Sequence, residues 1–268
     1  MKKERIDVLL VEQGFFDSRE KAKRAVMAGL VYDEHGRVDK PGQKIDIEAC
    51  ITVKGNTLKY VSRGGLKLEK AIETFGIDMQ DKLMLDIGSS TGGFTDCALQ
   101  YGAKYVYALD VGTNQLVWKL RSDARVEVME QTNFRYATKE MFKHGLPDFA
   151  SIDVSFISLK LIFMPLKDIL IKDGEFVALV KPQFEAGKDQ VGKNGIIKDP
   201  KIHLEVLEKV MDYAMENGFS LLHLSYSPIT GGHGNIEYLA HFKNDGKAKI
   251  DRSTLSAIVE ESHNYFEK

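Results

Sequence analysis

From residue 82 onward, short apolar runs alternate with amphipathic segments, and this alternation most restricts how the 268-residue chain can fold. The run at 176–180 is apolar throughout, as expected for a central parallel strand that is buried on both faces. Helices are predicted over 94–100 and 200–218. Strands are predicted at 83–87, 105–110, 126–129, 149–153, 176–180, 221–226 and 236–242. Strands that alternate with helices predict an α/β fold with a doubly wound, Rossmann-like sheet.

The first 60 residues follow a different pattern and predict a separate, small α+β domain. Ile6, Leu9 and Leu10 predict a short amphipathic helix that ends at Gly14. A second helix is predicted over 19–28, with its basic side chains pointing outward, and short strand-like runs follow it. We therefore predict a small domain at 1–60, a linker and entry helix at 61–80, the sheet domain at 81–245 and a C-terminal helical extension at 246–268.

Composition excludes several classes of protein. Apolar residues make up 43% and charged residues 28% of the chain, which is typical of a folded globular protein. The net charge of −2 gives no global preference for nucleic acid, although a local basic face can still bind it. The two cysteines lack metal-ligand spacing, so neither a bound metal nor a disulfide framework is predicted. Since no targeting or spanning segment is recognisable, we expect a soluble, cytoplasmic protein without a membrane partner.

A glycine-rich loop follows the first predicted strand of the sheet domain. Glycines let the backbone approach a ligand closely, and the following helix offers free N–H groups. The loop matches neither the dinucleotide pattern G-x-G-x-x-G nor a P-loop, and Asp110, which ends the next strand, is suited to ribose hydroxyls. These features favour a nucleoside without a diphosphate, such as S-adenosyl-L-methionine. The alternative is an ordinary strand–turn–helix with capping residues.

Four polar residues are predicted to meet at the sheet's ligand edge. Asp153 and Lys181 each end a predicted strand, Glu237 lies at the start of the last one, and Lys67 precedes the sheet. The carboxyl ends of parallel strands form the ligand crevice of such a fold. Two lysines and two acids together are suited to activating a hydroxyl group, because a lysine with a lowered pKa can take its proton. Taken singly, each residue can equally be a turn cap or a surface charge.

Four motifs together resemble those of one family. They are DIGSSTGGFTD at 86–96, DVSFIS at 153–158, VKPQFE at 180–185 and GNIE at 234–237. They are similar to the motifs of the TlyA family, whose members are often labelled haemolysin A-like. That family joins an RNA-binding domain, named after ribosomal small-subunit protein four, to an FtsJ/RrmJ-like methyltransferase domain. The resemblance covers nearly the whole chain and implies 2′-O-methylation of cytidine ribose in ribosomal RNA.

The resemblance also implies roles for individual residues. The catalytic set would be Lys67, Asp153, Lys181 and Glu237, with Lys181 nearest the 2′-hydroxyl and able to approach neutrality in the field of its neighbours. Asp86 and the loop would hold the methionine part of S-adenosyl-L-methionine, Asp110 the ribose, and the segment around Asn133 the adenine. The expected cofactor-binding residues are Asp86, Gly88, Ser89, Ser90, Thr91, Gly92, Gly93, Phe94, Asp110 and Asn133. Ser89 stands where the family pattern leads us to expect alanine.

Ribosomal RNA or a ribosomal subunit is the implied partner. A basic helix in the small domain and a basic loop at 192–195 would bind its phosphates. The expected RNA-binding residues are Arg19, Lys21, Lys23, Arg24, Arg63 and Lys193. The sequence leaves open the target nucleotide and the oligomeric state.

Two other functions remain possible on the sequence. The first is a membrane-lytic protein, as the haemolysin label suggests, although no long, strongly amphipathic helix supports it. The second is an RNA-binding ribosome-assembly factor with an inactive methyltransferase domain. The intact four-residue set argues against the second.

Overall fold

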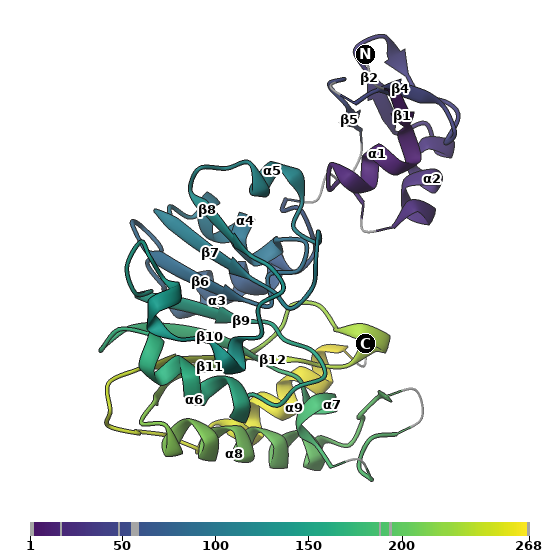
Figure 1. Ribbon diagram of the computed structural model, residues 1–268. Helices are drawn as coiled ribbons and strands as arrows, with labels where there is room; N and C mark the ends of the chain where they lie inside the picture. The colour runs from purple at the N-terminus through teal and green to yellow at the C-terminus, as the bar shows by residue number, and fades with distance from the viewer. Residues whose placement is uncertain are drawn as a thin grey trace.

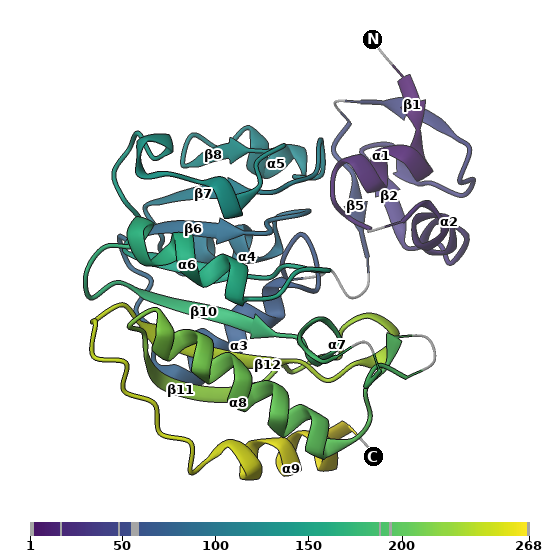
Figure 2. The same ribbon diagram turned by 60° about the horizontal axis from the view of Figure 1, so that its bottom comes forward.

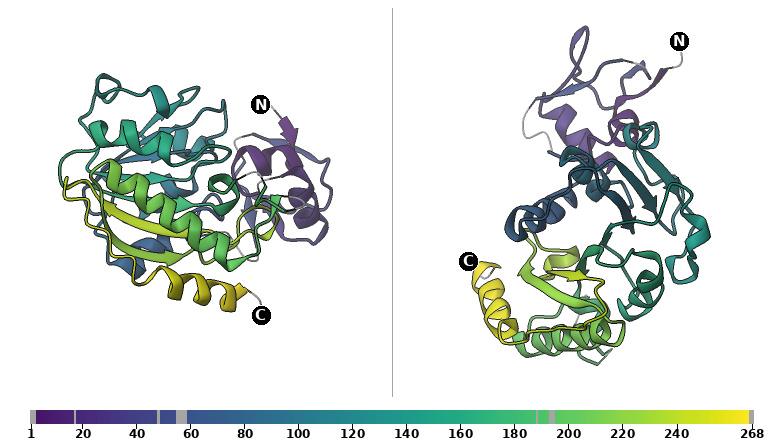
Figure 3. Two further views of the ribbon diagram at one scale, coloured as in Figure 1. Left: turned by 90° about the horizontal axis from the view of Figure 1, so that it is seen from below. Right: turned by 90° about the vertical axis from the view of Figure 1, so that its left-hand side faces the viewer.

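The computed structural model describes residues 3–16, 18–47, 49–54, 59–187, 189–192 and 195–266. The described chain forms a small N-terminal module, up to residue 54, and a larger sheet domain from residue 59 onward (Figure 1). The N-terminal module stands to one side of the sheet domain, at the end that is remote from the C-terminal helix (Figure 3, right).

The N-terminal module packs two helices against short strands. The elements are β1 Lys3–Arg5, α1 Ile6–Glu12, α2 Arg19–Met27, β2 Val31–Asp33, β3 Gly36–Arg37, β4 Lys44–Asp46 and β5 Thr52–Val53. Ser18 caps α2 by accepting a hydrogen bond from the N–H of Lys21, and Leu10, Val26 and Val31 lie in the buried core. Both predicted helices are therefore present, and α2 ends one residue earlier than predicted.

A buried carboxylate joins the beginnings of the two helices. Asp7 is fully buried on α1, and its oxygens accept hydrogen bonds from Arg5, at 2.9 and 3.1 Å, and from Arg19, at 2.9 Å. Arg19 is therefore not simply an outward-pointing side chain of α2, as the helical periodicity predicted. Its guanidinium neutralises a carboxylate from another helix, which periodicity within one helix cannot reveal.

The sheet domain contains a seven-stranded sheet with the order β11-β12-β10-β9-β6-β7-β8. Its strands are β6 Leu83–Ile87, β7 Tyr105–Leu109, β8 Val126–Met129, β9 Phe149–Ile152, β10 Glu175–Val180, β11 Ser220–Tyr226 and β12 Tyr238–Lys243. The five strands from β10 to β8 are parallel, while β12 runs antiparallel to both of its neighbours. All seven strands were predicted, with small differences at their ends.

Helices cover both faces of the sheet, so the predicted doubly wound α/β fold is confirmed. On one face α3 and α4 pack in one apolar cluster, and on the other α6 and α8 pack in a second cluster, which α9 extends (Figure 2). The helices are α3 Gly65–Phe75, α4 Gly93–Gln100, α5 Trp118–Arg121, α6 Lys160–Ile169, α7 Pro182–Glu185, α8 Pro200–Glu216 and α9 Leu255–Phe266, with 3-10 turns η1 Phe134–Tyr136, η2 Lys139–Met141 and η4 Gly232–Gly234. The sequence analysis did not predict α6, which contains Pro165.

We predict that Asp7→Asn destabilises the N-terminal module in a pH-dependent way. The hydrogen bonds from Arg5 and Arg19 lower the pKa of Asp7 to about 2, against the opposing effect of burial. A lowered carboxyl pKa stabilises the folded state above pH 4, and this contribution is lost as the pH falls from about 4 to about 2. We expect a loss of about 2 kcal/mol at pH 7.

Hydrogen exchange of residues 18–47 at pH 7 and pH 3 measures this effect within the module. Arg24→Gln, which removes an exposed charge from α2 of the same module, is the control. Equal protection in Asp7→Asn and the control at pH 7 would contradict the structural role of the buried carboxylate.

Candidate active site

Four side chains of alternating charge lie in contact at one edge of the sheet. The ammonium nitrogen of Lys181 lies 2.5 Å from Asp153 Oδ1, and that of Lys67 lies 3.9 Å from Asp153 Oδ2. Lys67 also donates a hydrogen bond of 2.6 Å to Glu237 Oε2. The side chains of Lys67, Lys181 and Glu237 are at most 10% exposed. Mutual pairing offsets the cost of burying these charges.

The register of the sheet explains why these residues meet. Asp153 follows β9 and Lys181 follows the adjacent parallel strand β10, so both lie at the carboxyl edge. In the antiparallel pair of β10 and β12, Val180 lies opposite Tyr238, which brings Glu237 to the same edge. Glu237 lies just before β12, whereas the sequence placed it inside that strand. All four predicted catalytic residues therefore lie together, and their roles remain predictions.

A cavity of about 540 Å³ opens beside this cluster. All four of these side chains line it, together with Gly88 and Ser90 from the glycine-rich loop. Gly231 also lines it, and a Cβ atom at this position would lie only 2.0 Å from Glu237 Oε1. A glycine at this position therefore lets the Glu237 carboxylate lie against the loop before β12.

Asp86 lies beneath the glycine-rich loop and does not line the cavity. It is fully buried, and its carboxylate accepts hydrogen bonds from the hydroxyls of Thr95, at 2.7 Å, and Ser151, at 3.0 Å. Burial raises its pKa to about 7. Asp86 thus joins β6, α4 and β9 through these hydrogen bonds, and its predicted contact with the cofactor stays a prediction.

A close backbone contact with the end of the adjacent strand requires glycine at position 88. Its φ is +86°, and a Cβ atom there would lie 2.3 Å from the backbone carbonyl oxygen of Asp153. The N–H of Asp153 in turn donates to Ile87 at 3.0 Å. The glycine-rich loop and the residue that links both lysines are therefore in direct backbone contact.

The other predicted cofactor residues differ in their surroundings. Asp110 lies at the end of β7, where its carboxylate accepts hydrogen bonds from the N–H groups of Ser90, at 2.8 Å, and Gly112, at 2.7 Å. Asn133 is exposed and accepts a hydrogen bond from the N–H of Arg135. Four of the remaining loop residues are buried, namely Ser89, Gly92, Gly93 and Phe94, and Thr91 is half-buried.

The structure adds aromatic and amide groups that the sequence analysis did not single out. Phe156 is 90% exposed at the cavity, has a φ of +62°, and its ring centroid lies 4.9 Å from that of Phe184. Gln183 also lines the cavity, and among the described residues its Oε1 is the buried side-chain atom without a hydrogen-bond partner. Both residues lie within motifs that were recognised, but only the folded chain shows that they are exposed or unpaired.

Glu185 joins two of the motifs. Its buried carboxylate accepts hydrogen bonds of 2.7 Å from the hydroxyl of Ser158 and from the N–H of Leu159. Burial raises the pKa of Glu185. This contact fixes the loop that carries Phe156 against α7, next to Lys181.

The predicted RNA-binding residues that the structure describes lie in two places, on α2 and in the segment before α3. Lys21, Lys23 and Arg24 are on α2, where Lys23 pairs with Glu20 at 2.9 Å. Arg63 is exposed in the segment before α3, on the sheet domain. Lys193 lies outside the described residues.

Comparison with known proteins identifies both parts of the chain. A family model described as FtsJ-like methyltransferase matches residues 60–244, and one described as S4 domain matches residues 4–49. TlyA of Mycobacterium tuberculosis, named 16S/23S rRNA (cytidine-2′-O)-methyltransferase, is 40% identical over 256 residues, which cover 95% of each protein. The chain belongs to the TlyA family of FtsJ-like methyltransferases. The predicted resemblance and the predicted class of enzyme are therefore confirmed.

Two further relatives of this TlyA-family chain are closer in sequence. The Bacillus subtilis protein YqxC, named as a candidate rRNA methyltransferase, is 58% identical over 266 residues, covering 98% of this chain and 95% of that protein. A solved structure from Streptococcus thermophilus, described as a candidate hemolysin, is 56% identical with a TM-score of 0.78 and covers 100% of this chain and 98% of that one. Among the helices of the described residues, none is long and apolar enough to cross a membrane.

We predict that Gly88→Ala disrupts the candidate active site more than the same substitution does at another glycine with a left-handed backbone conformation. The new Cβ atom would collide with the Asp153 carbonyl oxygen, so the loop or β9 must move. Gly76→Ala is the control, because Gly76 has a φ of +66° but has open space around it. The control should lose only about 1–2 kcal/mol of stability, the strain of a left-handed alanine.

Thermal melting and calorimetric titration with S-adenosyl-L-methionine, the predicted cofactor, test this prediction. We expect Gly88→Ala to have the lower melting temperature and clearly weaker binding. Equal melting temperatures and equal affinities in the two variants would show that the close contact is unimportant.

Proposed function

We propose that this chain transfers a methyl group from S-adenosyl-L-methionine to the 2′-hydroxyl of a cytidine in ribosomal RNA. The observation that carries the proposal is the chain of contacts Lys181–Asp153–Lys67–Glu237 in the same cavity as Gly88 and Ser90. The names of relatives that are 40–58% identical support the substrate class. The cytoplasm, where ribosomes lie, is the proposed location.

We assign the parts of the chain accordingly. Residues 1–60 would bind RNA, 61–80 would form the linker and entry helix, 81–245 would carry the methyltransferase site and 246–268 would form the C-terminal extension. The matches of the S4 and FtsJ-like models to separate parts of the chain support this assignment.

The residues of the glycine-rich loop fit the proposed methyl donor. A Cβ atom at Gly88 would fill the approach between the loop and Asp153. Asp110 holds the loop through Ser90, and its oxygens keep lone pairs for ribose hydroxyls, since a carboxylate can accept about four hydrogen bonds. When bound, S-adenosyl-L-methionine supplies an electrophilic methyl group on a positively charged sulfur.

Lys181 would orient the 2′-hydroxyl and take up its proton. Transfer of one proton from the Lys181 ammonium to Asp153, across the 2.5 Å contact, leaves a neutral amine. That amine accepts the hydroxyl proton while the 2′-oxygen forms its bond to the methyl carbon and the carbon–sulfur bond breaks. The bonding electrons stay on sulfur, which becomes a neutral thioether, and one proton is finally released from Asp153. Acid–base assistance of this kind contributes about 10²- to 10⁴-fold.

Lys67 and Glu237 would assist this step by holding the Asp153 carboxylate in place. Glu237 holds the Lys67 ammonium at 2.6 Å, and Lys67 faces the second oxygen of Asp153 at 3.9 Å. This arrangement fixes the Asp153 carboxylate so that its other oxygen faces Lys181. Alignment of the reacting groups is a large part of catalysis in such a transfer.

Phe156 would hold the base of the target nucleotide. An exposed aromatic ring beside the cavity offers a surface on which an unstacked base can lie. The unpaired Oε1 of Gln183 can accept a hydrogen bond from an amino group such as the cytosine N4 amine, once the side chain turns toward the cavity.

We predict that Lys181→Ala lowers the rate of methyl transfer by about 10²- to 10⁴-fold while S-adenosyl-L-methionine binds almost as before. Lys181→Arg should fail similarly, because a guanidinium keeps its proton. Lys67→Met and Glu237→Gln should cause smaller losses, since they disturb only the orientation of Asp153. The measurement is single-turnover transfer to ribosomal RNA with saturating cofactor, and product mapping by mass spectrometry identifies the methylated nucleotide.

Lys172→Ala is the matched control, because Lys172 is an exposed lysine before β10, at the opposite edge of the sheet. Wild-type rates in Lys181→Ala would place the proton acceptor elsewhere. If the wild-type protein binds ribosomal RNA and cofactor but transfers no methyl group, the chain is an inactive assembly factor.

We predict that the exposed basic face of α2 contributes phosphate contacts. Lys23→Gln combined with Arg24→Gln should weaken RNA binding and reduce the slope of log K against log salt by about one unit for each lost contact. Arg19 is left unchanged, because it pairs with the buried Asp7 and its loss would perturb the fold. Filter binding at several salt concentrations is the measurement, and Lys172→Gln is the control. An unchanged slope would show that this face of α2 makes no phosphate contacts and is only exposed to solvent.

A further inference from the structure

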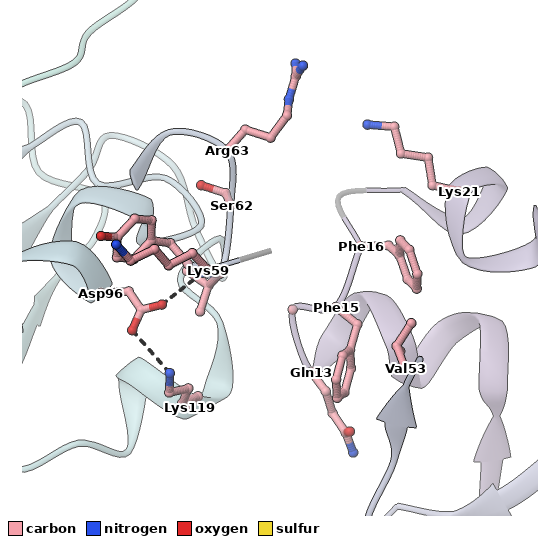
Figure 4. A pocket seen from close by; sticks show the side chains of 13 residues that line it. Gln13, Phe15, Phe16, Lys21, Val53, Lys59, Ser62, Arg63, Asp96 and Lys119 are labelled. Carbon is pink, nitrogen blue, oxygen red and sulfur yellow. Dashed lines mark hydrogen bonds and ion pairs between the residues drawn. The ribbon is translucent and has the colours of Figure 1, made fainter. Parts of the chain in front are cut away.

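A second cavity, of about 440 Å³, lies between the N-terminal module and the sheet domain, away from the catalytic residues. Figure 4 shows Phe15, Phe16 and Val53 on one wall, with Ser62 and Arg63 on the other. None of the steps proposed above uses this interdomain cleft.

One wall of the interdomain cleft is aromatic and is fixed in place. Phe15 and Phe16 follow α1, and both rings are only partly buried against the core of the N-terminal module. The N–H of Phe16 donates to the carbonyl of Leu10 at 3.2 Å, which holds the turn. Gly14 touches the sheet domain, since a Cβ atom there would lie 2.9 Å from Val117. The rings are therefore presented by a turn that is tied to both domains.

The charges around the interdomain cleft are mainly positive. Lys21 and Arg63 stand at its mouth on opposite walls. Lys59 and Lys119 also line it, and the ammonium group of Lys59 is paired with Glu69 (Figure 4). The acidic lining residue, Asp96, is already engaged by Lys119 at 3.2 Å and by a backbone N–H at 2.9 Å. Aromatic rings below a basic rim are the combination that binds unpaired nucleotides, because bases stack on rings and phosphates contact cations.

The interdomain cleft is continuous with the catalytic helix. Arg63 lies four residues before Lys67, in the segment that leads into α3. Ser62 lies against the glycine-rich loop, where a Cβ atom at Gly93 would be 2.3 Å from its hydroxyl oxygen. A strand that places one nucleotide at Lys181 can therefore reach the cleft with neighbouring nucleotides.

We propose that the interdomain cleft binds an unpaired nucleotide of the RNA substrate that neighbours the methylated one. Its base stacks on Phe15 and Phe16, and its phosphates contact Lys21 and Arg63. This inference rests on the proposed RNA substrate and adds a second recognition site to it. The bound nucleotide fixes the distance between the N-terminal module and the target, which selects where along the RNA the methyl group is placed.

Photo-cross-linking tests the proposal without requiring catalysis. Full-length Lys181→Ala protein is irradiated with a ribosomal RNA transcript that contains 4-thiouridine, and cross-linked peptides are identified by mass spectrometry. We expect a cross-link on the peptide that carries Phe15 and Phe16. Since cross-linking does not depend on methyl transfer, failure of this test and failure of the proposed function are distinguishable.

Substitutions then separate base stacking from packing between the domains. Phe15→Leu with Phe16→Leu should weaken RNA binding by about 5- to 150-fold, the range for loss of a stacked base, while cofactor affinity is unchanged. Phe15→Tyr with Phe16→Tyr keeps both rings and should bind RNA almost as the wild type does. Met27→Ala, at a side chain that is 75% exposed on α2 outside the cleft, is the control.

Three results would overturn the proposal. One is cross-linking confined to other peptides, such as the one that carries Phe156. Another is RNA affinity that is unchanged by the leucine pair, and a third is equal loss in the leucine and tyrosine pairs, which would indicate packing between the domains. If the leucine pair fails to fold, as judged by circular dichroism, the cross-linking result alone decides.

Discussion

The contact between Lys181 and Asp153 is the interaction on which the candidate active site depends. Asp153 is bound in three ways: its side chain faces two ammonium groups, its N–H bonds to β6, and its carbonyl lies against Gly88. Movement of the glycine-rich loop therefore moves the carboxylate that orients Lys181. Two sites are therefore coupled in position and form one unit. One is proposed to hold the methyl donor, and the other is proposed to move the proton.

Buried carboxylates hold this unit from below. Asp86 accepts from Thr95 and Ser151, and Glu185 accepts from Ser158 and Leu159. Burial raises both pKa values, so ionising these groups opposes folding as the pH rises above about 4. Apolar residues at these positions would avoid this cost but could not join separate loops by hydrogen bonds. The arrangement favours a fixed geometry at the cavity over maximum stability.

The sequence predicted those features that depend on local pattern. The strand predicted at 176–180 lies within β10 because an uninterrupted apolar run has few alternatives in a buried sheet, and the strands at 83–87 and 126–129 match β6 and β8 in their bounds. The meeting of Asp153 with Lys181 followed from the rule that parallel strands end at one edge. In contrast, the burial of Asp86, the pairing of Arg19 with Asp7 and the close contact at Gly88 each depend on a neighbour from another element. No periodicity encodes such a neighbour, so these features required the structure.

The position of Arg63 indicates how the two domains could act on one RNA strand. It lies at the mouth of the interdomain cleft, in the segment directly before α3, the helix that carries Lys67. A phosphate held there would bear on the same segment that carries the Lys67 ammonium to Asp153 and Glu237. RNA bound in the cleft would thus affect the position of α3, the helix that carries Lys67 of the acid–base cluster. Binding energy from nucleotides remote from the reaction can in this way be used to align the reacting groups, which is how an enzyme gains rate from a large substrate.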